Sequence, residues 1–309
     1  MRMLQFELWK DCSNNCSFCW NRDLIHSITP QDIKIENINY VISRLDGDIS
    51  GYDVVSIIGG EFFEGQLKDL EVKKAFTDLI YKFVSLLKGN KVEQVFIMLS
   101  FMRSVLPDLD EVISIFDSEG VLNKVLWCTS YDETGRFHTK EQKQIWINNI
   151  EKYSKNIRIH TEMIMTEPMI NAIIDGNVSL KWFFDRGVSV DFIRPRVHIN
   201  KDRSDKTKQE TLGIVPFIYP KRNTFLKFLS YLQKEYPQKL EDLYSMEIRA
   251  FDVELVSEKR VMHRDIEHYL EDKEKDKILP CGHSDKFAGY IDSDNCMVCD
   301  IEKYKKELM

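Results

Sequence analysis

The sequence predicts an α/β protein built around a parallel sheet, and two observations lead to that prediction. Six short strand-like segments alternate along the chain with segments whose apolar residues recur at helical spacing. In addition, Val54–Ile58 is an apolar run of the kind found in parallel strands that are covered on both faces. Strands that alternate with helices in this way favour right-handed crossovers within a single sheet. The chain has 309 residues, of which 43% are hydrophobic, so one large core is expected.

Each strand is predicted from its own side-chain pattern. Residues 3–9 alternate apolar and polar side chains directly before a group of cysteines. Further strands are expected over residues 54–58, 92–101, 121–131, 157–165 and 188–193.

The helices between these strands begin and end at recognisable residues. Pro107 suits the first turn of a helix, Thr139 followed by Gln142 forms a capping-box pattern, and Gly89 closes the longest helix. Helices are expected over residues 31–46, 72–87, 107–116, 139–150, 169–173 and 223–236. After residue 194 the alternation ends. Residues 246–256 and 259–263 are expected to form a hairpin, and residues 264–277 a charged helix or linker.

Three cysteines lie within eight residues directly after the first strand. They are Cys12, Cys16 and Cys19. Thiolates on one short loop can converge on a single metal centre, and iron–sulfur clusters are held by cysteine thiolates. Because a cubane cluster has four irons, three cysteines leave one iron open to a substrate or cofactor. Structural zinc would need a fourth ligand, for which His26 is the nearby residue, and disulfide formation is a further alternative.

The spacing CxxxCxxC, with Phe18 before the last cysteine, resembles the signature of the radical S-adenosylmethionine (SAM) superfamily. A second resemblance follows at Gly59-Gly60-Glu61, directly after the apolar strand. The family places such a motif at the end of its second strand, against the amino group of SAM. A lone Gly-Gly after a strand is more often a turn, so the combination of the two motifs carries the resemblance.

The resemblance implies a partial (β/α)6 TIM-like barrel whose site lies at the carboxyl ends of the strands. It also implies that a [4Fe–4S] cluster on the three cysteines cleaves SAM reductively to a 5′-deoxyadenosyl radical, which abstracts hydrogen from a substrate. An external one-electron reductant would be the electron-donating partner. The residues expected to bind the SAM cofactor are Phe18, Gly59, Gly60, Glu61 and Ser130.

The same resemblance places the ribose and the methionine carboxylate of SAM near the ends of the fourth and fifth strands. Polar residues in that region are Ser130, Asp132, Thr161 and Glu162. Hydroxyls and acids at strand ends are also common helix caps, so either role fits them. Residues 157–165 lack the family's glycine-containing motif, which leaves the adenine contacts unassigned. Cys128, alone in an apolar strand, is interpreted as a small buried hydrophobic residue.

A second group of possible metal ligands lies near the end of the chain. Cys281, His283, Cys296 and Cys299 make a complete tetrahedral set for structural zinc. They also resemble a reduced form of the auxiliary iron–sulfur sites found in radical SAM enzymes that modify peptides. We expect one metal here, with zinc favoured over an auxiliary cluster. The predicted organisation is therefore a partial barrel over residues 1–200, a helix and hairpin extension over 201–277, and a small C-terminal metal-binding extension over 278–309.

The substrate is not determined by the sequence. The auxiliary-cluster interpretation favours a peptide or protein side chain. The basic segment 194–203, a solvated loop or an anion-binding rim, favours a nucleotide or nucleic-acid base. A different alternative is a non-catalytic metal-binding interaction protein with two cysteine-rich sites, against which Gly59-Gly60-Glu61 weighs. The net charge of −7 gives no support to a protein that coats nucleic acid.

Cysteine usage indicates the compartment. The seven cysteines lie mostly in two tight groups, which fits metal binding in a reducing cytoplasm better than a disulfide framework. We find no apolar run of membrane-spanning length and no secretion signal, so a cytoplasmic location without membrane contact is expected.

Overall fold

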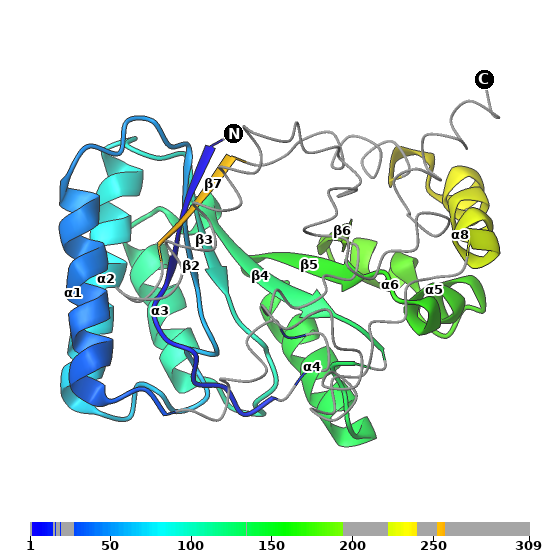
Figure 1. Ribbon diagram of the computed structural model, residues 1–309, viewed down its shortest axis with the longest axis horizontal. Helices are drawn as coiled ribbons and strands as arrows, with labels where there is room; N and C mark the ends of the chain where they lie inside the picture. The colour runs from blue at the N-terminus through cyan, green and yellow to red at the C-terminus, as the bar shows by residue number, and fades with distance from the viewer. Residues whose placement is uncertain are drawn as a thin grey trace, which may run out of the picture.

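The computed structural model describes residues 2–14, 16, 19, 28–133, 135–193, 222–239 and 252–256. Its centre is a sheet of seven parallel strands in the order β6-β5-β4-β3-β2-β1-β7 (Figure 1). The strands are β1 (Arg2–Glu7), β2 (Val54–Ile58), β3 (Gln94–Met98), β4 (Val125–Tyr131), β5 (Arg158–Ile164), β6 (Ser189–Ile193) and β7 (Asp252–Val256). All six strands predicted from the sequence are present, at or within a few residues of the expected bounds.

The first six strands lie in the sheet in the order in which they occur in the chain. Each crossover therefore moves one strand along the sheet in the same direction. Right-handed crossovers that all advance in one direction place their helices on the same face. This winding confirms the predicted α/β class. The sheet has two different edge strands, β6 and β7, so it is open and consistent with a partial TIM-like barrel.

The seventh strand lies in the segment that was expected to form a hairpin with residues 259–263. Within residues 246–256, Asp252–Val256 forms a strand that lies parallel to β1. It extends the sheet beyond its first strand, so a stretch within the predicted 201–277 extension is part of the main sheet. Residues 259–263 lie outside the described residues, as does the predicted metal-binding extension.

The helices connect the strands and begin largely where capping residues predict. They are α1 (Gln31–Asp46), α2 (Leu70–Lys88), α3 (Pro107–Ser118), η1 (Leu122–Lys124), α4 (Lys140–Tyr153), α5 (Glu167–Ile174), α6 (Leu180–Phe184) and α8 (Arg222–Glu235). Thr139 caps α4 by accepting from the Gln142 N–H at 3.2 Å. Gln142 departs from the reciprocal capping box, because its Oε1 accepts from His138 rather than from Thr139. None of the described helices combines the length and the apolarity needed to cross a membrane.

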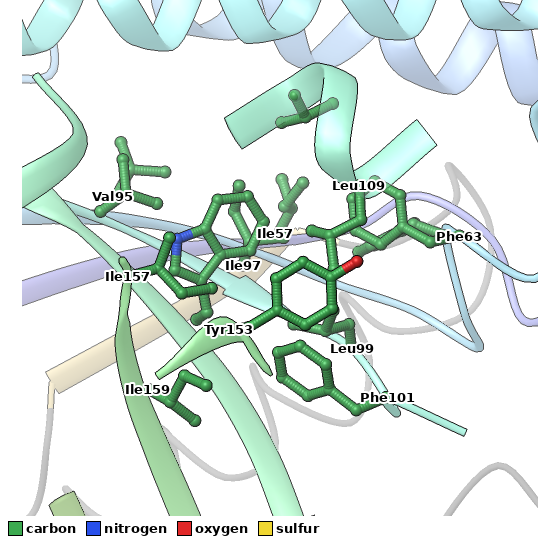
Figure 2. Close-up of a cluster of buried hydrophobic side chains, with 14 of the residues drawn as sticks. Ile57, Phe63, Val95, Ile97, Leu99, Phe101, Leu109, Tyr153, Ile157 and Ile159 are labelled. Carbon is green, nitrogen blue, oxygen red and sulfur yellow. The ribbon is translucent and has the colours of Figure 1, made fainter. Parts of the chain in front are cut away.

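The two faces of the sheet differ in character. Alternate strand residues such as Phe6, Ile57 and Trp127 are completely buried on the face that the helices cover. Side chains of this face meet residues of α3 and α4 in one apolar cluster, where Leu109 and Tyr153 pack near Ile97 (Figure 2). Residues on the other face of β4, β5 and β6 are mostly polar and partly exposed. The polar residues are Ser130, His160, Glu162, Ser189 and Asp191, and the apolar Leu126 and Cys128 share the face with them. Over these three strands the sheet therefore has an apolar face under the helices and a largely polar face opposite.

Candidate functional site

The cysteine loop begins at the carboxyl end of β1 and runs along the end of β2. Leu8 donates its N–H to the Ile58 carbonyl at 3.1 Å, which continues the pairing of the two strands beyond their ends. Gly60 then donates to the Trp9 carbonyl and Glu61 to the Asp11 carbonyl, both at 2.8 Å. The first predicted ligand, Cys12, follows directly. The two motifs that carried the resemblance, 12–19 and 59–61, thus meet at one end of the sheet, where the site was expected.

Gly59 and Gly60 have a packing role in this contact. A Cβ atom added to Gly60 would lie 2.1 Å from the Asp11 carbonyl oxygen, and one added to Gly59 would lie 2.6 Å from the Trp9 carbonyl oxygen. Real Cβ contacts essentially never come this close, so only glycine lets the cysteine loop approach β2 as it does.

Glu61 is a buried residue whose carboxylate joins the segment after β2 to the end of β3. Its Oε1 accepts the N–H groups of Phe62 and Phe63, and its Oε2 accepts the N–H of Ser100 after β3. Burial and the nearby Glu64 carboxylate raise the pKa of Glu61 to about 7, although the three N–H donors oppose the shift. These donors occupy both oxygens, so the Glu61 side chain holds the segment after β2 against the end of β3, while its backbone binds Trp9 and Asp11 before the cysteines.

Glu64 holds the cysteine loop directly, and the sequence analysis missed it. Its carboxylate accepts from Ser13 Oγ at 2.7 Å, from Asn14 Nδ2 at 2.8 Å and from Ser100 Oγ at 3.0 Å. These partners lie between 36 and 51 residues away in sequence. No local pattern around Glu64 signals such a role, because the interaction depends on the docking of β1 and β2.

The three cysteines of the loop differ in their surroundings. Cys16 is buried, whereas Cys12 and Cys19 are partly exposed. The Cys12 sulfur accepts from the backbone N and from Nδ2 of Asn14, each at 3.5 Å. Burial is the main cause that raises the pKa of Cys12 to about 12, and it also raises the pKa of Cys16. Without a bound cation, the Cys12 thiol therefore stays protonated at neutral pH.

The donor set fits a thiolate-bound iron–sulfur centre in its chemistry. Three sulfurs lie on one loop, and two N–H groups approach one of them, as in clusters whose sulfurs accept hydrogen bonds. Among the described residues, however, no three His, Cys, Asp or Glu side chains are gathered into a group that could hold a metal ion. Cys12, Cys16 and Cys19 therefore remain predicted ligands. Residues 15, 17–18 and 20–27, including Phe18 and His26, lie outside the description.

The polar residues predicted near the ends of β4 and β5 separate by face. Ser130 and Glu162 pair in register between β4 and β5 on the polar face, and Glu162 pairs in turn with Asp191 of β6. Thr161 is completely buried on the helix-covered face, away from them. Asp132 accepts from the Gly135 N–H and from Thr166 Oγ1 at 3.1 Å, so it connects the loop after β4 to the start of α5.

His160 lies on the same polar face. The sequence analysis missed this residue and its partners, Ser189 and Asp191. His160 Nδ1 lies 3.0 Å from Ser189 Oγ, and Nε2 lies 3.5 Å from Asp191 Oδ2. The signal was present as polar residues at every second position of β5, Arg158, His160 and Glu162. Cys128 is buried beside this group, and burial raises its pKa well above the ordinary value, ahead of nearby carboxylates. Its interpretation as a small buried residue agrees with this environment.

The sequence analysis also missed Arg136, a buried arginine. Its Nη1 donates to Ser130 Oγ at 2.7 Å, and its Nη2 donates to the Ser100 carbonyl at 2.7 Å. It therefore links the ends of β3 and β4 beside the cysteine loop. The remaining predicted site residues, Cys281, His283, Cys296 and Cys299, and the basic segment 194–203 lie outside the described residues.

Comparisons with known proteins add little to this picture. No family model and no curated protein matches the sequence. One solved structure, of TYW1 with a lysine-pyruvate adduct bound, is similar over 73% of this chain and 70% of that chain. Its TM-score is 0.38 and its sequence identity is 13%, so this likeness carries no argument about the present chain.

Proposed function

We propose that this protein is a radical SAM enzyme that binds a [4Fe–4S] cluster through Cys12, Cys16 and Cys19. One observation carries the proposal: the three-cysteine loop docks through Trp9 and Asp11 onto the glycines that follow β2. The residues directly before the cysteine motif are thus in backbone contact with Gly59-Gly60-Glu61 at the carboxyl end of a parallel sheet, the end at which α/β sheets of this winding carry their sites.

The chain's own residues have distinct parts in this proposal. Glu64 fixes the loop through Ser13 and Asn14, and Asn14 directs two N–H groups at the Cys12 sulfur. Because Glu61 already accepts three N–H groups, contact of residues 59–61 with the cofactor would come from the glycine backbone. Phe18 and Ser130 complete the proposed SAM-binding set. When bound, the cluster would supply one electron, received from an external reductant, to cleave SAM to methionine and a 5′-deoxyadenosyl radical.

The polar face of β4, β5 and β6 would receive the substrate. Its partly exposed side chains offer both donors and acceptors beside the proposed cofactor position. A peptide or protein side chain and a nucleotide or nucleic-acid base both stay proposals, since the tail cysteines and the segment 194–203 on which they rest lie outside the described residues. For the tail we propose one metal on Cys281, His283, Cys296 and Cys299, with zinc ahead of an auxiliary cluster.

The proposal predicts two measurable results with anaerobically reconstituted full-length protein. Wild type should bind about four irons per chain at the first site, and dithionite reduction with SAM should yield 5′-deoxyadenosine, quantified by chromatography. The triple variant C12A/C16A/C19A should lose the product and the loop iron. The double variant C296A/C299A should keep both, since its changes lie only at the tail.

Elemental analysis of the triple variant separates the remaining alternatives. One zinc and almost no iron per chain supports the proposed tail site, whereas several irons would assign an auxiliary cluster to it. Iron-loaded wild type that binds SAM and forms no 5′-deoxyadenosine would overturn the enzymatic proposal in favour of a non-catalytic metal-binding protein.

A further inference from the structure

Arg136 is a buried cation whose described partners are all uncharged. The residue is only 4% exposed. Its guanidinium donates to Ser130 Oγ, to the Ser100 carbonyl and, at 3.3 Å, to Thr129 Oγ1. The third nitrogen, Nε, is buried and has no hydrogen-bond partner in the part of the chain that the structure describes. The guanidinium therefore keeps one donor for a group that these residues do not supply.

This charge also lacks a close carboxylate. Among the described residues, no carboxylate oxygen lies within 4.0 Å of the Arg136 nitrogens. A buried charge without a paired opposite charge is costly, and buried charges in proteins are normally paired or bound to a charged ligand. The position of Arg136 thus indicates an anionic group next to it.

The cysteine loop is the neighbour that can carry this negative charge. The Ser100 carbonyl accepts from Arg136, and its Oγ donates to Glu64 Oε1 at 3.0 Å. Glu64 in turn accepts from Asn14, the residue whose N–H groups reach the Cys12 sulfur. A chain of hydrogen bonds therefore runs from Arg136 to the first cysteine of the loop.

We propose that Arg136 is the counter-charge of the metal centre on the cysteine loop, a positioning residue that stabilises its negative charge and raises its reduction potential. The inference rests on the proposed function. Three thiolates bring negative charge to a cluster, and the electron from the external reductant adds one more while no bond is made or broken. A fixed buried cation stabilises the reduced form more than the oxidised form, and net charge and hydrogen bonding are known determinants of cluster potential.

The test measures the midpoint potential of the reconstituted full-length protein by electron paramagnetic resonance during redox titration. We expect R136Q to titrate at a more negative potential than wild type, and R136K, which keeps the charge, to lie between them. The matched control is R103Q. Arg103 is exposed and donates to Ser13 of the same loop at 3.1 Å, so water and salt screen its charge, and its loss should leave the potential unchanged.

A second pair of variants keeps the arginine in place. S130D puts a carboxylate where Ser130 Oγ accepts from Arg136, which neutralises the guanidinium without removing it, and S130N is the uncharged control. S130D should shift the potential in the same direction as R136Q, and S130N should not. This pair decides the question if R136Q fails to fold.

The outcomes separate this inference from the proposed function. Wild type without iron and sulfide overturns both. Wild type with a cluster, together with unchanged potentials in R136Q and S130D, overturns the role of Arg136 and leaves the proposed function standing.

Discussion

At the scale of single residues, the Gly59-Gly60 pair has a role that its sequence did not specify. The resemblance assigned the pair to the cofactor. The geometry adds an independent reason for glycine, since the carbonyl oxygens of Trp9 and Asp11 occupy the space that Cβ atoms would fill. The same two positions are therefore required for the loop to dock, whatever the loop binds.

The substitution G60A should destabilise the fold by roughly 3 kcal/mol, at the upper end of the cost of overpacking. A Cβ 2.1 Å from the Asp11 carbonyl oxygen forces the loop or the β2 end to move, because backbone atoms on both sides cannot yield like a flexible side chain. Urea denaturation measures the change. The control G47A, whose Cβ would meet its nearest atom at 3.3 Å with φ at −76°, should cost well under half as much. Equal losses in the two variants would contradict the close-approach argument.

At the scale of elements, α8 belongs to the sheet's helical layer although it lies in the predicted 201–277 extension. Phe228, Leu229 and Leu232 of α8 are completely buried in the main core. The Phe228 ring packs edge-on against Phe192 of β6 with 5.3 Å between centroids. Thr224 Oγ1 also donates to Glu167 Oε1 of α5 at 2.7 Å. The helix is therefore expected to unfold together with the strands.

We expect L229A to lower the free energy of unfolding by about 2–5 kcal/mol, the range for truncating a buried leucine. Circular dichroism in urea should show one transition that moves as a whole, because the lost contacts belong to the shared core. The exposed neighbour variant K227A should change the stability by no more than about 0.5 kcal/mol. Loss of a separate, smaller transition in L229A would instead indicate that the extension folds independently.

At the scale of the whole molecule, stability should depend on pH through the junction at Glu61. This carboxyl group lies where the end of β2, the cysteine loop and the end of β3 meet. Its pKa is raised from 4.5 to about 7 in the folded protein, chiefly by burial and then by Glu64. The folded state thus binds a proton that the unfolded state releases between these two pH values. Linkage then requires the free energy of unfolding to fall as the pH rises from 4.5 to 7 and to level off above 7.

The comparison of wild type with E61Q isolates this effect, because glutamine does not titrate. Between pH 4.5 and pH 8, wild type should lose up to about 3 kcal/mol more stability than E61Q in urea denaturation. E64Q should reduce the loss in an otherwise wild-type chain, since it removes the charge that repels the Glu61 carboxylate. A wild type whose stability relative to E61Q rises over this pH interval would show that the three N–H donors outweigh burial.

Much of the fold was predictable because its signals are local. The strand and helix periods, the Thr139 cap and the Pro107 start depend on neighbours a few residues apart, and each is present in the structure. The cysteine spacing and the glycine pair likewise located the end of the sheet where the two motifs meet. The parallel sheet followed from the alternation of strands and helices, whereas the order of β1 to β6 within it was seen only in the structure.

The tertiary structure alone decided the interactions that join distant segments. No pattern in the sequence pairs β7 with β1, ties Glu64 to Asn14, or places His160 between Ser189 and Asp191. The burial of Arg136 could not be predicted from the sequence either, because an arginine in a loop after a strand is ordinarily solvated. The sequence by itself determined which segments become strands and helices, because those choices depend on local spacing. Which polar side chains become buried partners depended on packing between distant segments. The partners of Glu64 in the cysteine loop, for example, lie 50 and 51 residues away, and only the folded chain brings them together.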